Sequence, residues 1–284
     1  MCVLSPGRGR AEIWQGLLAR RTYGVSRSRM VIDHTLNGAP MGDEISPGPA
    51  QFTLSLTAAN AVDRVEFLKD NILEKMIVHS GTWERQPLPG RFAFKFEVEF
   101  GWGPETRLFP DAALKVWEGS LQVPGHLMGV EKLWNSFGQQ ILEWRDDRCD
   151  FRLTTHRGTE TGKWMGPSQV RRESLVFEVE GGIDDVLTLT VDGEQYALPV
   201  RMLLQGTRIY AQYSQCERRI IKKFGPTPHY RDDFIWHCAF KFRVRRAVPS
   251  PAYTLNESFT TTLDAGSQYR LRVWLKNGDA AWTS

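Results

Sequence analysis

The sequence predicts a mostly β protein, made of antiparallel β-sandwich units with one N-terminal α-helix. Apolar and polar residues alternate over many short stretches, which is the period of a strand that buries one face. Gly, Pro, Asn and Asp separate these stretches, and Asn-Gly or Asp-Gly pairs at residues 37–38, 192–193 and 277–278 are typical of hairpin turns. Many short strands with such turns are typical of the β-sandwich class.

One helix is predicted, over residues 10–21. Its apolar residues recur at helical spacing and are Ile13, Trp14, Leu17 and Leu18. Two arginines stand near the end of this stretch, and Gly24 follows shortly after. A basic last turn and a following glycine are typical helix-end signals.

The first third of the chain then takes the period of a strand. Strands are predicted at residues 30–36, 52–57, 62–68 and 92–100. The last alternates most cleanly, and one of its faces carries Phe92, Phe94, Phe96, Val98 and Phe100. We expect that face in the core and the opposite face, with Lys95, Glu97 and Glu99, in water.

The rest of the chain is less regular. Residues 114–123 suggest a pair of strands, residues 130–144 either a short helix or strands, and residues 222–233 a long exposed loop, rich in Pro, Gly and charge. Further strands are predicted at residues 169–180, 186–191, 196–203, 234–244 and 269–275.

Composition narrows the class of protein. The 284 residues are 41% apolar and 24% charged, with a net charge of +3, as in an ordinary globular protein. No apolar run approaches the roughly 18 residues that span a bilayer, and no signal-peptide core is visible. No Lys/Arg block with interleaved aromatics points to nucleic acid. We therefore expect a soluble, cytoplasmic protein without a membrane or nucleic-acid partner.

Several motifs resemble one protein family. They are IW at residues 13–14, LLARRTYG at 17–24, NGAPMG at 37–42, FGWGP at 100–104, WEG at 117–119, RAVP at 246–249 and YRLRVW at 269–274. Together they resemble the C-terminal part of metal-dependent hydrolases of the polymerase-and-histidinol-phosphatase (PHP) superfamily, in the carbaryl-hydrolase-like branch. The helix and the NGAPMG motif are the more specific of these features.

The resemblance implies a chain without the hydrolase's metal ligands. In the family, His, Asp and Glu ligands belong to a βα-barrel-like core that precedes the helix. Asp33 and His34 superficially suggest such a ligand motif, but they fall inside a predicted strand, and we interpret His34 as a strand side chain. The resemblance thus implies no cofactor in this chain, a divalent metal only in a full-length family member, and no activity of this chain alone.

The resemblance also suggests a domain organisation. Residues 1–24 would be a helical remnant that follows a missing catalytic core, and residues 25–100 and 234–284 would form a β-sandwich. Residues 101–233 would be an inserted β-rich unit. The partner would be the catalytic PHP-like domain or another subunit. If so, the apolar side chains of the helix lack their original partner, and we expect the helix to be poorly packed.

One local cluster could hold a metal ion. It consists of His229, Asp232, Asp233 and His237. A cation needs two to four such ligands converging at about 2 Å, and a loop followed by a strand could bring them together. The other interpretation, which we favour, is a set of solvated loop charges.

The ten tryptophans suggest a second kind of site, because indole faces stack on sugars. Five lie in the irregular middle of the chain: Trp102, Trp117, Trp134, Trp144 and Trp164. The favoured interpretation is that they fill a core or cover sheet edges.

Three hypotheses on function result from these patterns and from the resemblance. The first is an accessory β region of a PHP-like hydrolase, the second a carbohydrate- or ligand-binding β-sandwich module, and the third a weak metal-dependent hydrolase.

Overall fold

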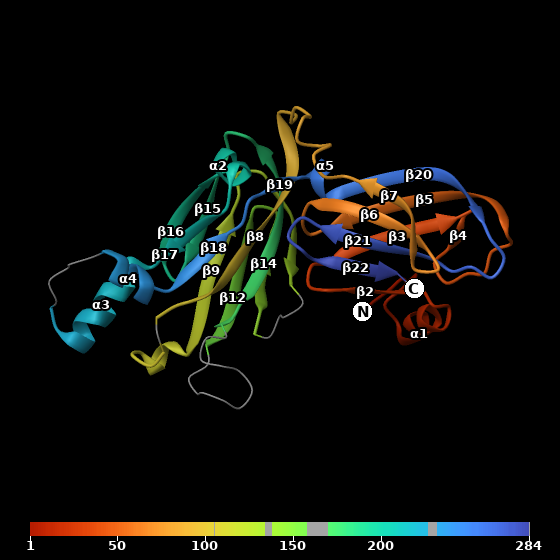
Figure 1. Ribbon diagram of the computed structural model, residues 1–284. Coiled ribbons are helices and arrows are strands. Elements are labelled where there is room, and N and C mark those ends of the chain that lie inside the picture. The colour runs from red at the N-terminus through yellow and green to blue at the C-terminus, as the bar shows by residue number, and fades with distance from the viewer. Residues whose placement is uncertain (105, 134–137, 158–169, 227–231, 284) are drawn as a thin grey trace. The chain divides into compact units, whose positions relative to one another are not determined.

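The computed structural model divides the chain into two compact units. It describes residues 1–104, 106–133, 138–157, 170–226 and 232–283. Unit 1 comprises Met1–Leu88 and Val248–Ser284, and unit 2 comprises Pro89–Ala247. Both consist mainly of antiparallel strands (Figure 1), so the predicted mostly β class is confirmed. The inserted unit starts earlier and ends later than the expected residues 101–233.

Unit 1 is built from two sheets. One has the order β1-β2-β22-β21-β6-β7, formed by Cys2–Val3, Thr22–Val25, Ala280–Thr283, Tyr269–Leu275, Val62–Lys69 and Ile72–Val78. The other has the order β20-β5-β3-β4, formed by Thr254–Leu263, Gly48–Ala58, Met30–Leu36 and Ala39–Pro40. Side chains of both sheets share one core, in which the ring centroids of Phe52 and Phe67 lie 5.2 Å apart. Unit 1 is therefore a β-sandwich.

The hairpin of β3 and β4 forms for the reasons visible in its residues. Met30 and Ile32 of β3 are buried, whereas Val31 between them is exposed, as alternation requires. Asn37 and Gly38 have φ angles of 51° and 80°, the left-handed conformation that a tight hairpin turn needs. The predicted turn is confirmed.

Two helices and a short strand complete unit 1. Helix α1 spans Arg10–Leu18, α5 spans Ser250–Tyr253 and β19 spans Val248–Pro249. The predicted helix is confirmed, but it ends at Leu18 rather than residue 21. Arg20 then takes a φ of 58° and the chain enters β2, so the two arginines lie beyond the helix.

Unit 2 also contains two sheets. One has the order β10-β14-β8-β18-β17, formed by His126–Lys132, Glu173–Gly182, Arg91–Trp102, Lys241–Val244 and Arg208–Ala211. The other has the order β11-β12-β9-β15-β16, formed by Gln140–Trp144, Arg148–Arg157, Leu114–Gln122, Val186–Val191 and Glu194–Pro199, and β13 (Val170–Arg171) pairs with β12. Phe100 of β8 lies 5.1 Å from Trp117 of β9, so the two sheets share a core.

Unit 2 also contains helices among its described residues. They are η1 (Pro110–Ala112), α2 (Val200–Gln205), α3 (Tyr213–Phe224) and α4 (Asp232–Cys238). The strand predicted at 234–244 is wrong over its first half, and the strand at 196–203 ends at Pro199. Of the loop predicted at residues 222–233, residues 222–224 belong to α3 and residues 232–233 to α4, and residues 227–231 lie outside the described residues. The buried Cys216 and Ile220 of α3 stand one helical turn apart.

Two further observations concern single elements. Residues 114–123 form one strand, β9, rather than a pair. Among the described residues, no helix is long and apolar enough to cross a membrane.

Candidate functional site

Strand β8 lies in the middle of its sheet, between β14 and β18. Its phenylalanine face is buried, as predicted. The opposite face was predicted to meet water, and this is wrong: Lys95, Glu97 and Glu99 are all buried. Alternation shows which residues point away from the core, but long side chains of neighbouring strands can still cover them.

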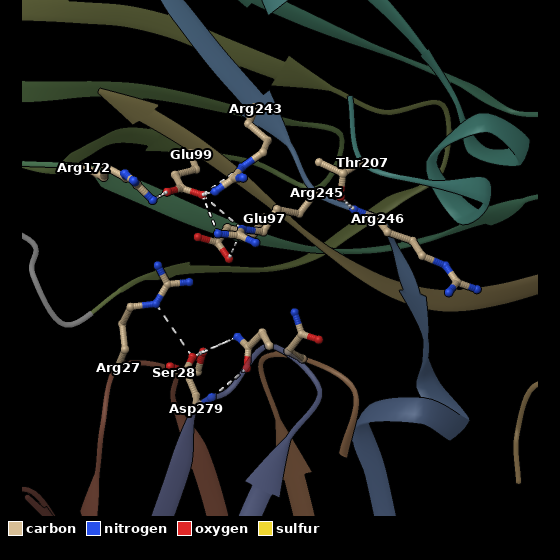
Figure 2. Close-up of polar contacts among 12 residues, drawn as sticks. Arg27, Ser28, Glu97, Glu99, Arg172, Thr207, Arg243, Arg245, Arg246 and Asp279 are labelled. Carbon is tan, nitrogen blue, oxygen red and sulfur yellow. Dashed lines mark hydrogen bonds and ion pairs between the residues drawn. The ribbon is translucent and has the colours of Figure 1, made fainter. Parts of the chain in front are cut away.

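Glu99 is the centre of this covered face, with 0% of its surface exposed. One carboxylate oxygen, Oε2, accepts hydrogen bonds from Nη2 of Arg243 at 2.6 Å and from Nη2 of Arg245 at 2.7 Å. The other, Oε1, accepts one from Nη1 of Arg172 at 3.3 Å. Figure 2 shows the three guanidinium groups converging on the carboxylate. Arg243 lies directly opposite Glu99 in the ladder of β18 and β8.

The neighbouring groups extend this network. Nε of Arg245 also lies 3.3 Å from the carboxylate of Glu97. The indole of Trp102 has two guanidinium groups over it, that of Arg172 at 5.0 Å and that of Arg243 at 4.9 Å. Each such cation–π contact contributes roughly 0.5–1 kcal/mol or more. The arginines are therefore oriented by the ring as well as by the carboxylates.

The network holds Glu99 in its ionised form. Burial alone would raise the pKa of Glu99, but the hydrogen bond from Arg243 and the charges of Arg245, Arg243 and Arg172 outweigh burial and lower it. A carboxylate with a lowered pKa, enclosed by three guanidinium groups, is a poor proton acceptor. The arrangement therefore links β8, β18 and the start of β14, and it is not a general-acid or general-base site.

Unit 1 has a polar cluster of its own around Asp279. Its carboxylate accepts hydrogen bonds from Ser28 and, at 2.9 Å, from Nδ2 of Asn277, and Nε of Arg27 lies 3.7 Å away. Ser28 is buried. This cluster ties the turn before β22 to the segment after β2. It satisfies buried polar groups in the way that structural networks do.

The predicted metal cluster receives no support from its secondary structure. Asp232 and Asp233 open α4, and His237 is an exposed residue in its last turn. His229 lies outside the described residues. Among the residues that the structure describes, no group of three or more His, Cys, Asp and Glu side chains is arranged to hold a metal ion.

The tryptophans named as sugar-stacking candidates lie in different surroundings. Trp117 is fully buried and donates a hydrogen bond to Thr155 at 2.8 Å, so its face has no room for a sugar. Trp102 is half-buried beneath arginines, and Trp144 is exposed on β11. Trp134 and Trp164 lie outside the described residues.

Helix α1 presents an apolar surface. Trp14 is 59% exposed and Leu18 is 67% exposed, and Ile13 is also exposed. Of the residues in α1, Gly16 is buried. A Cβ atom at Gly16 would lie 2.7 Å from a methyl group of Val3, so the helix touches unit 1 along its glycine side. Ile13, Trp14 and Leu18 are therefore poorly packed against unit 1.

Comparison of the chain with known proteins finds no match. No protein-family model matches the chain, and neither a curated protein nor a solved structure is significantly similar to it.

Proposed function

We propose that the chain is an accessory β region that acts with a PHP-like metal-dependent hydrolase domain, located on another subunit or on another part of the same protein. In this proposal the chain supplies no metal ligand and no catalytic group. It docks on the catalytic domain and shapes or stabilises it, in the cytoplasm. The observation that carries the proposal is the exposed apolar surface of α1.

The physical argument is one of burial. Fully burying a large apolar side chain contributes roughly 1.5–3 kcal/mol relative to leaving it exposed. Because Trp14 and Leu18 are mostly exposed, this chain gains little of that free energy from them. An exposed tryptophan beside an exposed leucine on one helix is the kind of anchor that fills a pocket in a partner. The resemblance of residues 13–24 to the family identifies the partner that we propose.

The polar clusters favour the same proposal. The carboxylates of Glu99 and Asp279 are each held by several donors, and carboxylates held in this way maintain a fold rather than exchange protons with a substrate. The two alternative functions, carbohydrate binding and weak metal-dependent hydrolysis, rest on the tryptophans and on His229 to His237. Neither has an observation in its favour as specific as the surface of α1.

The experiment measures binding to a PHP-like catalytic domain of the carbaryl-hydrolase-like branch by isothermal titration calorimetry. We expect the wild-type chain to bind, and the double variant Trp14→Ser/Leu18→Ser to bind at least about tenfold more weakly because both anchors are lost. Gln15→Ser is the matched control. It introduces serine into the same helix at an exposed polar position and should leave binding unchanged.

Two outcomes would contradict the proposal. One is that the wild-type chain does not bind the catalytic domain at all. The other is that the double variant and Gln15→Ser bind equally well while circular dichroism shows the same helix content in both.

A further inference from the structure

Unit 1 contains a cavity of about 560 Å³. Most of its apolar wall is supplied by Leu36, Ala39, Pro40, Met41, Ile45 and Leu263. These residues belong to the β3–β4 hairpin, the loop after it and the end of β20, and the elements can be followed in Figure 1. Small-molecule sites usually have volumes of roughly 300–1,000 Å³ and mainly apolar walls. The cavity has the size of such a site, and its lining combines this apolar wall with polar and charged side chains.

The backbone keeps this cavity in shape. The turn at Asn37 and Gly38 closes the hairpin, and the chain then passes the end of α1. A Cβ atom at Gly42 would lie 2.0 Å from the carbonyl oxygen of Ala19, and Gly42 has a φ of 92°. Only glycine fits such a place. Residues 39–42 of the NGAPMG motif therefore line one side of the cavity, and Gly42 packs that side against the end of α1.

His34 is the polar group of this cavity. It projects from the inner face of β3, lines the cavity and is 8% exposed. Its Nδ1 atom is buried and has no hydrogen-bond partner among the described residues. A buried nitrogen without a partner costs roughly 1–3 kcal/mol. A ligand that supplies the missing hydrogen bond would remove this unfavourable free energy.

The imidazole of His34 is neutral near pH 7, because burial lowers its pKa to about 4 despite the opposing charge of Asp33. A neutral imidazole has one donor and one acceptor nitrogen. It can accept a hydrogen bond from a hydroxyl group or donate one to a carbonyl oxygen. It offers no charge to a ligand.

The charged side chains around the cavity have partners, and all of them except Arg270 face an opposite charge. The pairs and contacts are Arg20 with Glu44 at 3.4 Å, Arg21 with Asp43 at 3.6 Å, Asp264 with Lys69, and Arg270 with Gln268 at 2.7 Å. Each charged group of the lining thus already has a partner. A cationic ligand would leave its water shell without gaining a counter-charge, which is costly. For an anionic ligand, Arg270 is the one positive charge of the described lining that does not already face a carboxylate.

From these observations we propose that the cavity binds an uncharged small molecule with an apolar body and one hydroxyl or carbonyl group, and that this group hydrogen-bonds to His34. The apolar body would lie against the wall formed by Leu36, Met41 and Leu263. This site is separate from the surface of α1, so it does not depend on the proposed function.

The test uses three probes with the same apolar body: 3-phenylpropan-1-ol, 3-phenylpropanoate and 3-phenylpropylammonium. Binding to the whole chain is followed by NMR, through the ring-nitrogen signals of His34 where His34 is present and through the proton signals of the probe in every protein. A ligand of this size in a matching pocket should have a Kd of about 0.1–1 mM. We expect the alcohol to shift the His34 signals, and both charged probes to bind at least about tenfold more weakly.

Two variants locate the binding in the cavity. Replacing the imidazole by a similar ring, His34→Phe, should weaken binding of the alcohol roughly two- to tenfold, because one hydrogen bond is lost. Ala39→Trp keeps His34 but fills the cavity, and it should abolish binding. Val31→Phe is the matched control, because it places the same ring on the exposed side of β3, and it should bind as wild type.

The proposal is overturned if the alcohol leaves the His34 signals unchanged, or if the charged probes bind as tightly as the alcohol. It is also overturned if Ala39→Trp binds the alcohol with the wild-type Kd. The probe series uses the wild-type chain alone, so it decides the matter even where a variant fails to fold.

Discussion

Glu99 in unit 2 and His34 in unit 1 are both buried polar side chains on a strand, but their surroundings are opposite. Glu99 is ionised and has three guanidinium groups around its carboxylate. His34 is neutral, lines a cavity and has a buried nitrogen with no hydrogen-bond partner in the part of the chain that the structure describes. The difference teaches how to separate structural from binding groups. A buried polar group whose bonds are complete holds strands together, whereas one with an open bond beside a cavity is available to a ligand.

The largest expected effect concerns Glu99→Gln. The substitution keeps the shape of the side chain but removes the charge that holds Arg172, Arg243 and Arg245 together. Breaking a buried ion pair costs roughly 3–5 kcal/mol. Because these arginines are partly exposed, we expect the lower end, a loss of about 3 kcal/mol in the free energy of unfolding. Urea unfolding measures this value.

Glu118→Gln is the control for that variant. Glu118 also accepts a hydrogen bond from an arginine on a neighbouring strand, Nε of Arg152 at 3.0 Å, but both side chains are exposed. Surface pairs contribute roughly 0–1 kcal/mol, so the loss should be small. Equal losses for the two variants would mean that the network around Glu99 has no special structural role.

A somewhat smaller effect is expected from the pH dependence of His34. Its pKa is about 4 in the folded chain, below the ordinary 6.5, so the unfolded chain binds the proton more tightly. With respect to His34, the folded chain therefore has its full stability above pH 6.5, and the free energy of unfolding decreases as the pH falls toward 4. We expect the free energy of unfolding to fall by about 2–3 kcal/mol between pH 7 and pH 4.5 from this group.

The measurement compares urea unfolding of the wild type with that of His34→Phe at both pH values. The variant cannot take up this proton, so its stability should fall by about 2–3 kcal/mol less than that of the wild type. Other groups titrate in both proteins and cancel in the difference. Parallel pH profiles would contradict a neutral, buried His34.

The smallest effect distinguishes two glycines, Gly38 in the hairpin turn and Gly42 in the cavity wall. Both Gly38 and Gly42 have positive φ angles, but a Cβ atom at Gly38 would meet nothing within 4 Å, whereas one at Gly42 would strike the carbonyl oxygen of Ala19. We expect Gly38→Ala to cost about 1 kcal/mol and Gly42→Ala about 2 kcal/mol in unfolding free energy. Thermal unfolding measures both, and the reverse order would show that the wall does not pack on α1 as described.

Local sequence patterns predicted much of the fold. The alternation of β3 and β8, the turn at residues 37–38 and the helix near the N-terminus all form where their residues predict them. The prediction of strands failed where a run of residues fits both the period of a strand and that of a helix. The residues of α4 include Phe234, Ile235 and Trp236, which resemble a buried strand as much as a helix, and a short apolar run cannot separate the two.

The candidate sites were less accessible to prediction. His34 was correctly interpreted as a strand side chain, but nothing around it in the sequence shows a cavity. The cavity wall is completed by residues 263–270, far along the chain. Likewise, the metal candidates were chosen because they are close in sequence and the tryptophans because they share the irregular middle of the chain, and neither ensures that side chains converge.

The sequence by itself determined the mostly β class, the hairpin turns and the face of each strand that points to the core, because these depend on periods and φ angles of neighbouring residues. The tertiary structure decided which buried polar groups acquire partners. Glu99 receives its hydrogen bonds from residues that are 73, 144 and 146 positions away, whereas Nδ1 of His34 has no partner among residues 1–104, 106–133, 138–157, 170–226 and 232–283. Such partners depend on strand order and register, which only the assembled sheets define.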